Sequence, residues 1–426
     1  MSCNWPLVKL ADVACIITTK IDANQITKDC YISTENMQPY KGGVSSADSL
    51  PSAAKFNSFR VGDTLFSNIR TYFEKVWLAS FSGGASADVL IFRTKDESVL
   101  LSEYLYHFLS SPEFIEFTVR TSKGAKMPRG DKGAMMDFEF KLPPVEIQKI
   151  IACSLQGLER KVRLNSQTNQ TLEQMAQAIF KSWFVDFEPV KAKMNGEQPE
   201  GMDAATASLF PEKLVESELG FIPDGWNIES IKDFGDVICG KTPSKKNADF
   251  YGGDVPFIKI PDTHGKVFIT ETSDTLTQVG DESQPKKRIP ENSICVSCIA
   301  TVGQVFITTK PSHTNQQINS VVPYDQNSLY YLLFKFKALN KHFHDLASGG
   351  SATLNMNTST FSKVALVRPT ADVLEAFHKT VGGLMEKMLA NQLENATLSE
   401  LRDTLLPKLL SGEIELGTSE ELVEAI

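Results

Sequence analysis

The sequence predicts an α+β protein in which two similar α/β domains are separated by two long antiparallel coiled-coil helices, related by a pseudo-two-fold internal repeat. Three observations predict this fold: a repeated segment, a seven-residue apolar pattern inside each copy, and about 145 residues of short strand-like runs before each copy. The 426 residues, 42% hydrophobic and 22% charged, are typical of a globular protein of two to three domains.

The repeat is clearest in two segments that align without a gap, residues 157–184 and 383–410. Seven of the twenty-eight positions are identical, where ordinary composition gives about two by chance. The identical pairs are Gly157/Gly383, Leu158/Leu384, Lys161/Lys387, Asn165/Asn391, Asn169/Asn395, Thr171/Thr397 and Leu172/Leu398. We interpret the alignment as a duplication.

Each copy has the pattern of a long helix, because its apolar and seam residues recur in alternating steps of three and four. Pro143 and Pro144 precede the first copy, and Pro369 precedes the second. A helix from Val145 to Asp186 would be about 60 Å long. Two such stripes in one chain predict an intramolecular coiled coil rather than two separate core helices.

The remaining segments follow from these helices. Short β-branched and aromatic runs such as 64–69, 89–92, 294–299 and 305–308 predict mixed α/β domains. The expected organisation is a first domain at 1–144, a central helix at 145–190, a connector at 191–222, a second domain at 223–370, a distal helix at 371–412 and an acidic tail at 413–426.

Composition and charge limit the function. The chain has no apolar run of membrane-spanning length, no secretory leader and an odd number of scattered cysteines, so we expect a cytoplasmic protein. Its net charge of −9 argues against a protein that coats nucleic acid over its whole surface, although local basic clusters remain possible.

The sequence lacks recognisable catalytic and metal-binding motifs. The single Pro-Pro, at Pro143, belongs to a helix start rather than to a methyltransferase loop. Asp131 or Asp137 with Glu139 and Lys141 could form a nuclease site. An acidic residue two positions before a basic one is common, however, and the second copy of the repeat lacks this pair. The pair Cys295 and Cys298 has no second pair to complete a zinc ribbon, and the six histidines form no ligand spacing. We therefore expect no catalysis and no bound cofactor or metal.

Basic residues gather in a few segments that could contact DNA. The segment 120–132 has Gly and Pro loop signals and suits phosphate contact or base reading, although a solvated surface is the simpler alternative. The matching loop of the second half, 348–358, is polar instead. The candidate DNA-binding residues are Arg70, Arg120, Lys123, Lys126, Arg129, Lys132, Lys241, Lys245, Lys246, Lys286, Lys287, Arg288, Thr353, Asn355 and Asn357.

Asparagines occupy seam positions of the predicted coiled coil. A buried Asn costs stability but fixes register when it meets another Asn. A two-fold axis at Gln167 and its repeat mate Leu393 requires antiparallel helices. The pairs that it predicts are Asn165 with Asn395 and Asn169 with Asn391.

At the helices the sequence resembles the specificity subunit of type I restriction-modification enzymes. The most specific segment, residues 169–189 (NQTLEQMAQAIFKSWFVDFEP), resembles the central region of that family almost word for word, and residues 398–414 are its distal counterpart. Residues 62–67, 142–148, 300–303 and 315–318 are similar to turns and strands of target recognition domains.

The resemblance implies a non-catalytic subunit whose two target recognition domains bind the halves of a bipartite double-stranded DNA site. It also implies two modification subunits that bring S-adenosylmethionine, and restriction subunits that bring ATP. The alternatives are the specificity chain of a related bifunctional system that cuts both sides of its site, a self-sufficient restriction enzyme, which the missing methyltransferase loops disfavour, and a coiled-coil scaffold without DNA function.

A second apolar stripe beside the seam is interpreted as the docking surface for a modification subunit. The alternative is that the stripe packs on its own domain. Its candidate partner-binding residues are Phe180, Trp183, Phe184, Phe187, Leu406 and Leu410.

Overall fold

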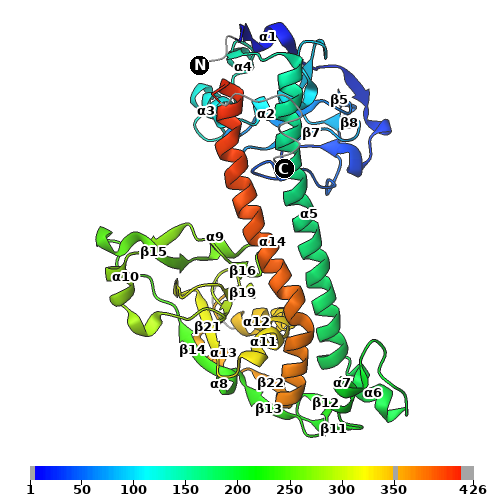
Figure 1. Ribbon diagram of the computed structural model, residues 1–426, viewed down its shortest axis with the longest axis vertical. Helices are drawn as coiled ribbons and strands as arrows, with labels where there is room; N and C mark the ends of the chain where they lie inside the picture. Colours follow the sequence, from blue (N-terminus) through cyan, green and yellow to red (C-terminus); the bar gives the residue numbers. More distant parts are fainter. Residues whose placement is uncertain (1–4, 349–353, 414–426) are drawn as a thin grey trace. The chain divides into compact units, whose positions relative to one another are not determined.

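The computed structural model describes residues 5–348 and 354–413, which form two compact units. One unit contains residues up to Leu164 together with those from Glu394, and the other contains Asn165–Leu393. Each unit therefore holds one α/β domain and one end of each of the two long helices, α5 (Val145–Phe184) and α14 (Ala371–Ser411) (Figure 1).

The two long helices run antiparallel within each unit. In the first unit Lys161 forms an ion pair with Glu394 at 3.3 Å, and the buried Leu155 shares a hydrophobic cluster with Leu406. In the second unit Asn391 contacts Asn169, whereas Phe377 packs on Trp183. Residue numbers thus rise along α5 as they fall along α14, which confirms the predicted antiparallel pair.

The first domain is a pair of small four-stranded sheets with helices beside them. The sheet orders are β2-β9-β6-β7 and β3-β5-β8-β4. The strands are β2 (Ala14–Ile16), β3 (Lys20–Asp22), β4 (Tyr31–Ile32), β5 (Lys55–Phe59), β6 (Thr64–Ser67), β7 (Val76–Leu78), β8 (Gly83–Ala85) and β9 (Val89–Thr94). The helices include α1 (Leu10–Val13), α2 (Ser102–Leu109), α3 (Pro112–Thr121) and α4 (Lys132–Met136).

The second domain also has two sheets, one of five strands and one of three. Their orders are β14-β21-β18-β19-β16 and β17-β15-β20. The strands are β14 (Gly235–Cys239), β15 (Tyr251–Ile258), β16 (Phe268–Ile269), β17 (Asp274–Leu276), β18 (Ile294–Ser297), β19 (Val305–Thr308), β20 (His313–Thr314) and β21 (Ile318–Pro323). The helices include α8 (Ile231–Phe234), α9 (Ile260–Thr263), α10 (Gln278–Glu282), α11 (Leu329–Ala338), α12 (Asn340–Ala347) and α13 (Thr358–Ser362).

Each domain is closed by pairing its first strand with its last. In the first domain β1 (Leu7–Lys9) pairs antiparallel with β10 (Glu139–Lys141). In the second, β13 (Asn227–Ser230) pairs in the same way with β22 (Ala365–Arg368). Because each last strand leads within a few residues into a long helix, this pairing anchors the helix to the start of its own domain.

The segment expected as a connector, 191–222, is folded. It contains most of α6 (Glu188–Met194), all of α7 (Ala204–Ser208) and an antiparallel hairpin of β11 (Leu214–Ser217) and β12 (Gly220–Pro223). Phe210 and Ile222 are buried and join the hydrophobic core of the second unit. The Gly, Pro and Glu content of the segment predicted a connector, although these two apolar residues attach it to the core. Of the acidic tail only Glu413 lies within the described residues.

The described helices include none that is both long enough and apolar enough to cross a lipid bilayer. The long helices α5 and α14 carry regular charged positions and bury only part of their surface.

Candidate nucleic-acid interface

Three loops of the first domain are joined by backbone hydrogen bonds, and basic residues lie on them. The first loop follows β6, the second precedes β9 and the third precedes α4. Asn68 N donates to the Asp88 carbonyl at 2.8 Å, and Gly130 N donates to the Asn68 carbonyl at 3.0 Å. Arg70 N donates to the Pro128 carbonyl at 2.9 Å. These bonds hold three segments that are distant in sequence at fixed separations.

The second domain forms the same three bonds with different residues. Cys298 N donates to the Gln317 carbonyl at 2.7 Å and its own carbonyl accepts from Met356 N at 2.9 Å. Ala300 N donates to the Leu354 carbonyl at 2.9 Å. We call this shared arrangement the three-loop frame. It places Cys298, Ala300, Gln317, Leu354 and Met356 at the positions of Asn68, Arg70, Asp88, Pro128 and Gly130.

The third residue after β6 in the first domain, and after β18 in the second, has a left-handed backbone. The φ angle is 50° at Arg70 and 63° at Ala300, and neither residue is glycine. Such conformations cost about 1 to 3 kcal/mol and persist where the surroundings impose them, often at functional sites. The same strained position in both domains shows that the frame, rather than the side chain, sets this backbone.

In the first domain the structure brings four of the predicted basic residues to the frame. Lys123 and Arg129 pair as an isolated antiparallel bridge, and the exposed Lys126 lies in the turn between them. Arg70 is joined to this turn through its backbone. The other two residues, Arg120 at the end of α3 and Lys132 at the start of α4, are exposed and flank the loop.

Carboxylates hold part of this basic loop in place. Arg129 Nη2 lies 3.0 Å from Asp88 Oδ1, and Lys123 Nζ lies 2.5 Å from Asp131 Oδ2. Asp131 also accepts hydrogen bonds from Gly133 N and Ala134 N as the N-cap of α4. The Lys123 hydrogen bond, followed by these backbone bonds, holds the pKa of Asp131 below its usual value. Asp131 is thereby explained as a cap rather than as the nuclease carboxylate considered from the sequence.

The corresponding loop of the second domain carries amides in place of cations. Asn355 occupies the position of Arg129, and the exposed Asn357 caps α13 through the Thr360 N–H at 2.9 Å. Thr353 lies outside the described residues. Amide side chains suit recognition of adenine edges, whereas Arg and Lys suit guanine and phosphate. One frame thus presents different chemistry in the two domains.

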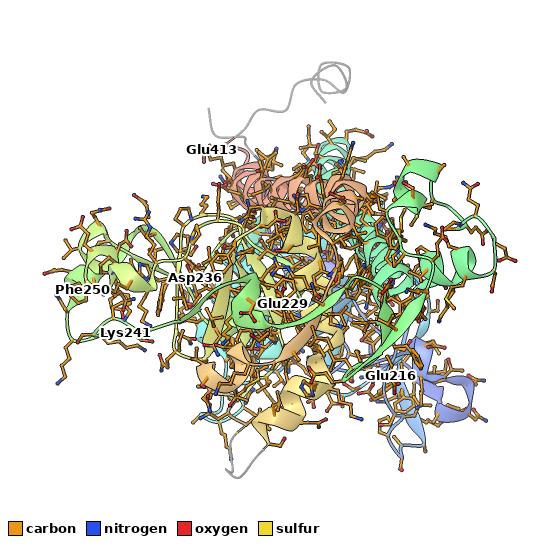
Figure 2. The ribbon with its side chains drawn as sticks, turned by 90° about the horizontal axis from the view of Figure 1, so that it is seen from below. Glu216, Glu229, Asp236, Lys241, Phe250 and Glu413 are labelled. Carbon is orange, nitrogen blue, oxygen red and sulfur yellow. The ribbon has the colours of Figure 1, made fainter. Side chains whose placement is uncertain are left out.

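The remaining basic candidates form a separate cluster on the second domain. Lys241, Lys245 and Lys246 are exposed, and so are Lys286 and Arg288, with Lys287 half-buried. Gln284 links the two groups, because its Nε2 donates to the Lys241 carbonyl at 2.9 Å. In Figure 2 the labelled Lys241 and Phe250 lie on the same projecting part of this domain, away from Glu216. Tertiary structure therefore joins runs about forty residues apart.

Sequence reasoning missed the middle loop of the frame. Asp88 and Gln317 sit just before β9 and β21, and neither belongs to a charge run or a known motif. Gln316, beside Gln317, is exposed and accepts a hydrogen bond from Thr242 Oγ1 at 2.6 Å. The sequence signal for this loop is the Asn-Gln-Gln-Ile segment at 315–318, which is similar to a segment of target recognition domains.

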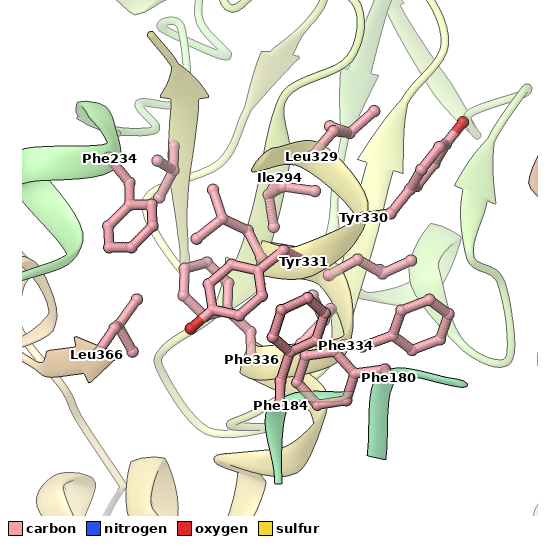
Figure 3. Packing of buried hydrophobic residues seen from close by; sticks show 14 of the residues in the cluster. Phe180, Phe184, Phe234, Ile294, Leu329, Tyr330, Tyr331, Phe334, Phe336 and Leu366 are labelled. Carbon is pink, nitrogen blue, oxygen red and sulfur yellow. The ribbon is translucent and has the colours of Figure 1, made fainter. Parts of the chain in front are cut away.

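The structure corrects the expected docking surface. Phe180, Trp183 and Phe184 are at most 6% exposed and belong to the core of the second unit. Figure 3 shows Phe180 and Phe184 among Tyr331, Phe334 and Phe336. The partly buried Phe187 packs on the same core, while Leu406 is buried and Leu410 partly buried against the first unit's core.

The physical reason for this correction is aromatic packing. The Phe184 ring centroid lies 5.0 Å from that of Tyr331 and 4.9 Å from that of Phe377, and Phe187 lies 5.9 Å from Trp226. The stripe is therefore buried by rings of the second unit, as in the alternative that it packs within this chain instead of forming an exposed docking surface.

The seam asparagines occupy interior positions of the helix pair. Asn391 is 1% exposed and its Nδ2 donates to Asn169 Oδ1 at 2.8 Å, which is the predicted pairing. Asn169 in turn donates to the Met388 carbonyl at 2.9 Å. Asn165 is buried and Asn395 half-buried, and because these two residues belong to different units their pairing stays a prediction.

Among the described residues no group of His, Cys, Asp and Glu side chains could hold a metal ion. Cys295 and Cys298 are buried on and beside β18, and burial raises the pKa of each thiol to about 12. Protonated, buried thiols are poor ligands and poor nucleophiles. Their burial explains the pair as packing residues of the second domain.

Comparison with known proteins identifies the repeat independently. A family model described as the type I restriction modification DNA specificity domain matches residues 3–174 and again residues 223–394. The two matches together cover most of the chain, and each includes one α/β domain with part of one long helix.

Individual relatives agree with the family model. The HindI specificity subunit of a type I restriction enzyme from Haemophilus influenzae is 40% identical over 96% of this chain and 100% of its own length. The MjaIX specificity subunit from Methanocaldococcus jannaschii is 26% identical over 74% of this chain and 70% of its own. The crystal structure of a type I S subunit from M. genitalium matches 97% of each chain with a TM-score of 0.59 and 13% identity, which supports the fold.

Proposed function

The chain belongs to the family of type I restriction-modification specificity subunits, and we propose that each of its two domains reads one half of a bipartite DNA site. The alternative of a chain from a bifunctional system that cuts both sides of its site is not favoured, because the relatives matched over most of their length are type I specificity subunits.

The observation that carries the proposal is the three-loop frame. Two domains share one set of backbone bonds, yet the frame carries Arg70, Asp88 and Arg129 in one domain and Ala300, Gln317 and Asn355 in the other. A scaffold that both domains share, with different side chains on it, is suited to reading two different short sequences in the same manner. Loops on a rigid scaffold are also where binding residues usually lie.

We assign the two kinds of contact by side-chain chemistry. Exposed lysines such as Lys126, Lys245 and Lys246 suit phosphate contact, which supplies affinity without sequence information. Residues of the frame, with Arg129 or Asn355 at the same position, suit base edges. The acidic remainder of the chain agrees with a protein in which only limited surfaces face DNA.

We further propose that the chain itself is non-catalytic and acts in a complex. Two modification subunits would bind S-adenosylmethionine, and restriction subunits would bind ATP, so that this chain supplies sequence recognition and the spacing of the two half-sites. With the aromatic stripe buried, the docking surface for the modification subunits involves other residues of the chain.

The direct test is to assemble the chain with its modification subunits and map the methylated positions in a host genome. We expect one bipartite motif with a constant gap. The chain alone should transfer no methyl group from S-adenosylmethionine and cut no DNA. Methyl transfer by the chain free of partners, or methylation without a two-part motif, would contradict the proposal.

A further inference from the structure

A buried polar network lies behind the basic cluster of the second domain. Asp281, Gln284 and His313 are 3%, 6% and 0% exposed. His313 Nε2 lies 2.7 Å from Asp281 Oδ1, and Arg288 Nη1 lies 2.9 Å from Asp281 Oδ2. Each oxygen of the Asp281 carboxylate thus has its own cationic or N–H partner.

Gln284 connects this network to the Lys241 segment. Gln284 Nε2 lies 2.9 Å from the Lys241 carbonyl and 3.3 Å from His313 Nδ1. The Gln284 amide thus joins the Lys241 backbone to one ring nitrogen of His313, and the other ring nitrogen contacts Asp281. One chain of bonds therefore runs from the Lys241 carbonyl through Gln284, His313 and Asp281 to Arg288.

Stability alone does not explain this arrangement. The Gln284 Oε1 atom is buried without a hydrogen-bond partner among the described residues. A buried acceptor left unsatisfied costs free energy, and replacing a buried polar network by apolar side chains is often neutral or stabilising. Such a network calls for a role besides holding the fold together.

We propose that Asp281 and His313 are positioning residues that set the orientation of Arg288, and its separation from the Lys241 segment, for reading the second half-site. The inference rests on the proposed function and deepens it for this domain. Arg288 is half exposed, with 47% of its side chain accessible, and among the described residues Asp281 is the one carboxylate that forms an ion pair with it.

A guanidinium has five N–H donors in a rigid plane, and it recognises guanine through two of them at once. A carboxylate that holds one nitrogen fixes the plane before DNA arrives, so less conformational entropy is lost on binding. Asp281 is itself held by His313, and the same histidine, through Gln284, holds the Lys241 backbone. Two DNA-facing segments are thereby set by one buried support.

The test uses the assembled methyltransferase, with methylation rates on duplexes that carry single base-pair changes in either half-site. We expect Arg288→Ala to lower discrimination at one base pair of the second half-site about ten-fold or more. Asp281→Asn and His313→Gln should lower it at the same base pair. The double variant Asp281→Asn/Arg288→Ala should lose no more than Arg288→Ala alone, because Asp281 acts through Arg288.

Asp274→Asn is the matched control, since Asp274 pairs with Lys259 at 2.5 Å in the same domain but outside the network. It should leave discrimination unchanged. A purely structural role for Asp281 would lower the melting temperature and weaken binding to all duplexes equally, which overturns the inference. Additive losses in the double variant, or an Arg288→Ala complex with wild-type discrimination, also overturn it.

Failure of the proposed function is distinguishable from these outcomes. In that case the wild-type complex itself shows no bipartite specificity, and the inference falls with it. If the wild-type complex reads a bipartite site and the Asp281 variant matches it at every base pair, the inference alone is wrong.

Discussion

Asn391 and Asn169 form a side-chain hydrogen bond of 2.8 Å between α14 and α5, inside the second unit. The bond joins the two residues that a two-fold relation between the repeats predicts. Asn391 is almost fully buried, so its amide cannot exchange this partner for water. The pair therefore favours one register of the helices, since any shift would leave polar groups unsatisfied.

We predict that Asn391→Leu lowers the free energy of unfolding by about 1 to 3 kcal/mol, because the Asn169 amide oxygen then loses its donor. The double variant Asn169→Leu/Asn391→Leu should recover most of that loss, since neither polar group remains. Denaturant unfolding of both variants measures the difference. A double variant that is less stable than the single one would contradict this account.

A heptad inserted into α14 alone should abolish binding to the wild-type site or change the gap between half-sites, while each half-site keeps its sequence. Matched heptads in α5 and α14 preserve the seam and lengthen each helix by about 10 Å, which corresponds to about three base pairs. Methylome mapping reads both the gap and the half-sites. Altered half-site sequences with an unchanged gap would refute the ruler role of the helices.

The triple variant Lys123→Ala/Lys126→Ala/Arg129→Ala should weaken binding of the assembled methyltransferase to its site. Loss of a base contact should cost about 1 to 3 kcal/mol at one base pair, whereas loss of phosphate contacts should mainly flatten the salt dependence. The control is the triple variant Lys9→Ala/Lys20→Ala/Lys55→Ala. It removes the same amount of positive charge at exposed positions elsewhere in the first domain. If the two variants weakened DNA binding equally, the basic loop would contribute only general charge and the prediction of specific contacts would be wrong.

Acid should destabilise the chain through His107. Burial lowers the pKa of His107 to about 3, while the unfolded side chain titrates near 6.5. The unfolded state therefore binds more protons between these values, and stability is lost as pH falls below about 6.5. By pH 5 the loss from this group is about 2 kcal/mol. His107→Gln should make the decline between pH 7 and pH 5 shallower, and His342→Gln, at an exposed position, should not.

Part of the site was accessible from sequence because charge and loop signals are local. The Gly and Pro content around Lys123 and Arg129 predicts a basic loop, and the structure forms one there. The three-loop frame that holds this loop could not be predicted from the sequence. Its bonds join Asn68 to Asp88 and Arg70 to Pro128, and backbone hydrogen bonds between distant loops leave no compositional trace.

The sequence by itself determined the duplication, the two antiparallel helices and the family, because residue identities, heptad periodicity and proline boundaries can be read without knowing which segments touch. Only the tertiary structure decided which face of each helix is buried. Phe180, Phe184 and Phe187 have the spacing of an exposed docking stripe as readily as that of a core face. Tyr331, Phe377 and Trp226, all distant in sequence from the stripe, cover it. Periodicity shows that one face of a helix is apolar. Which residues cover that face depends on contacts that form only when the whole domain folds.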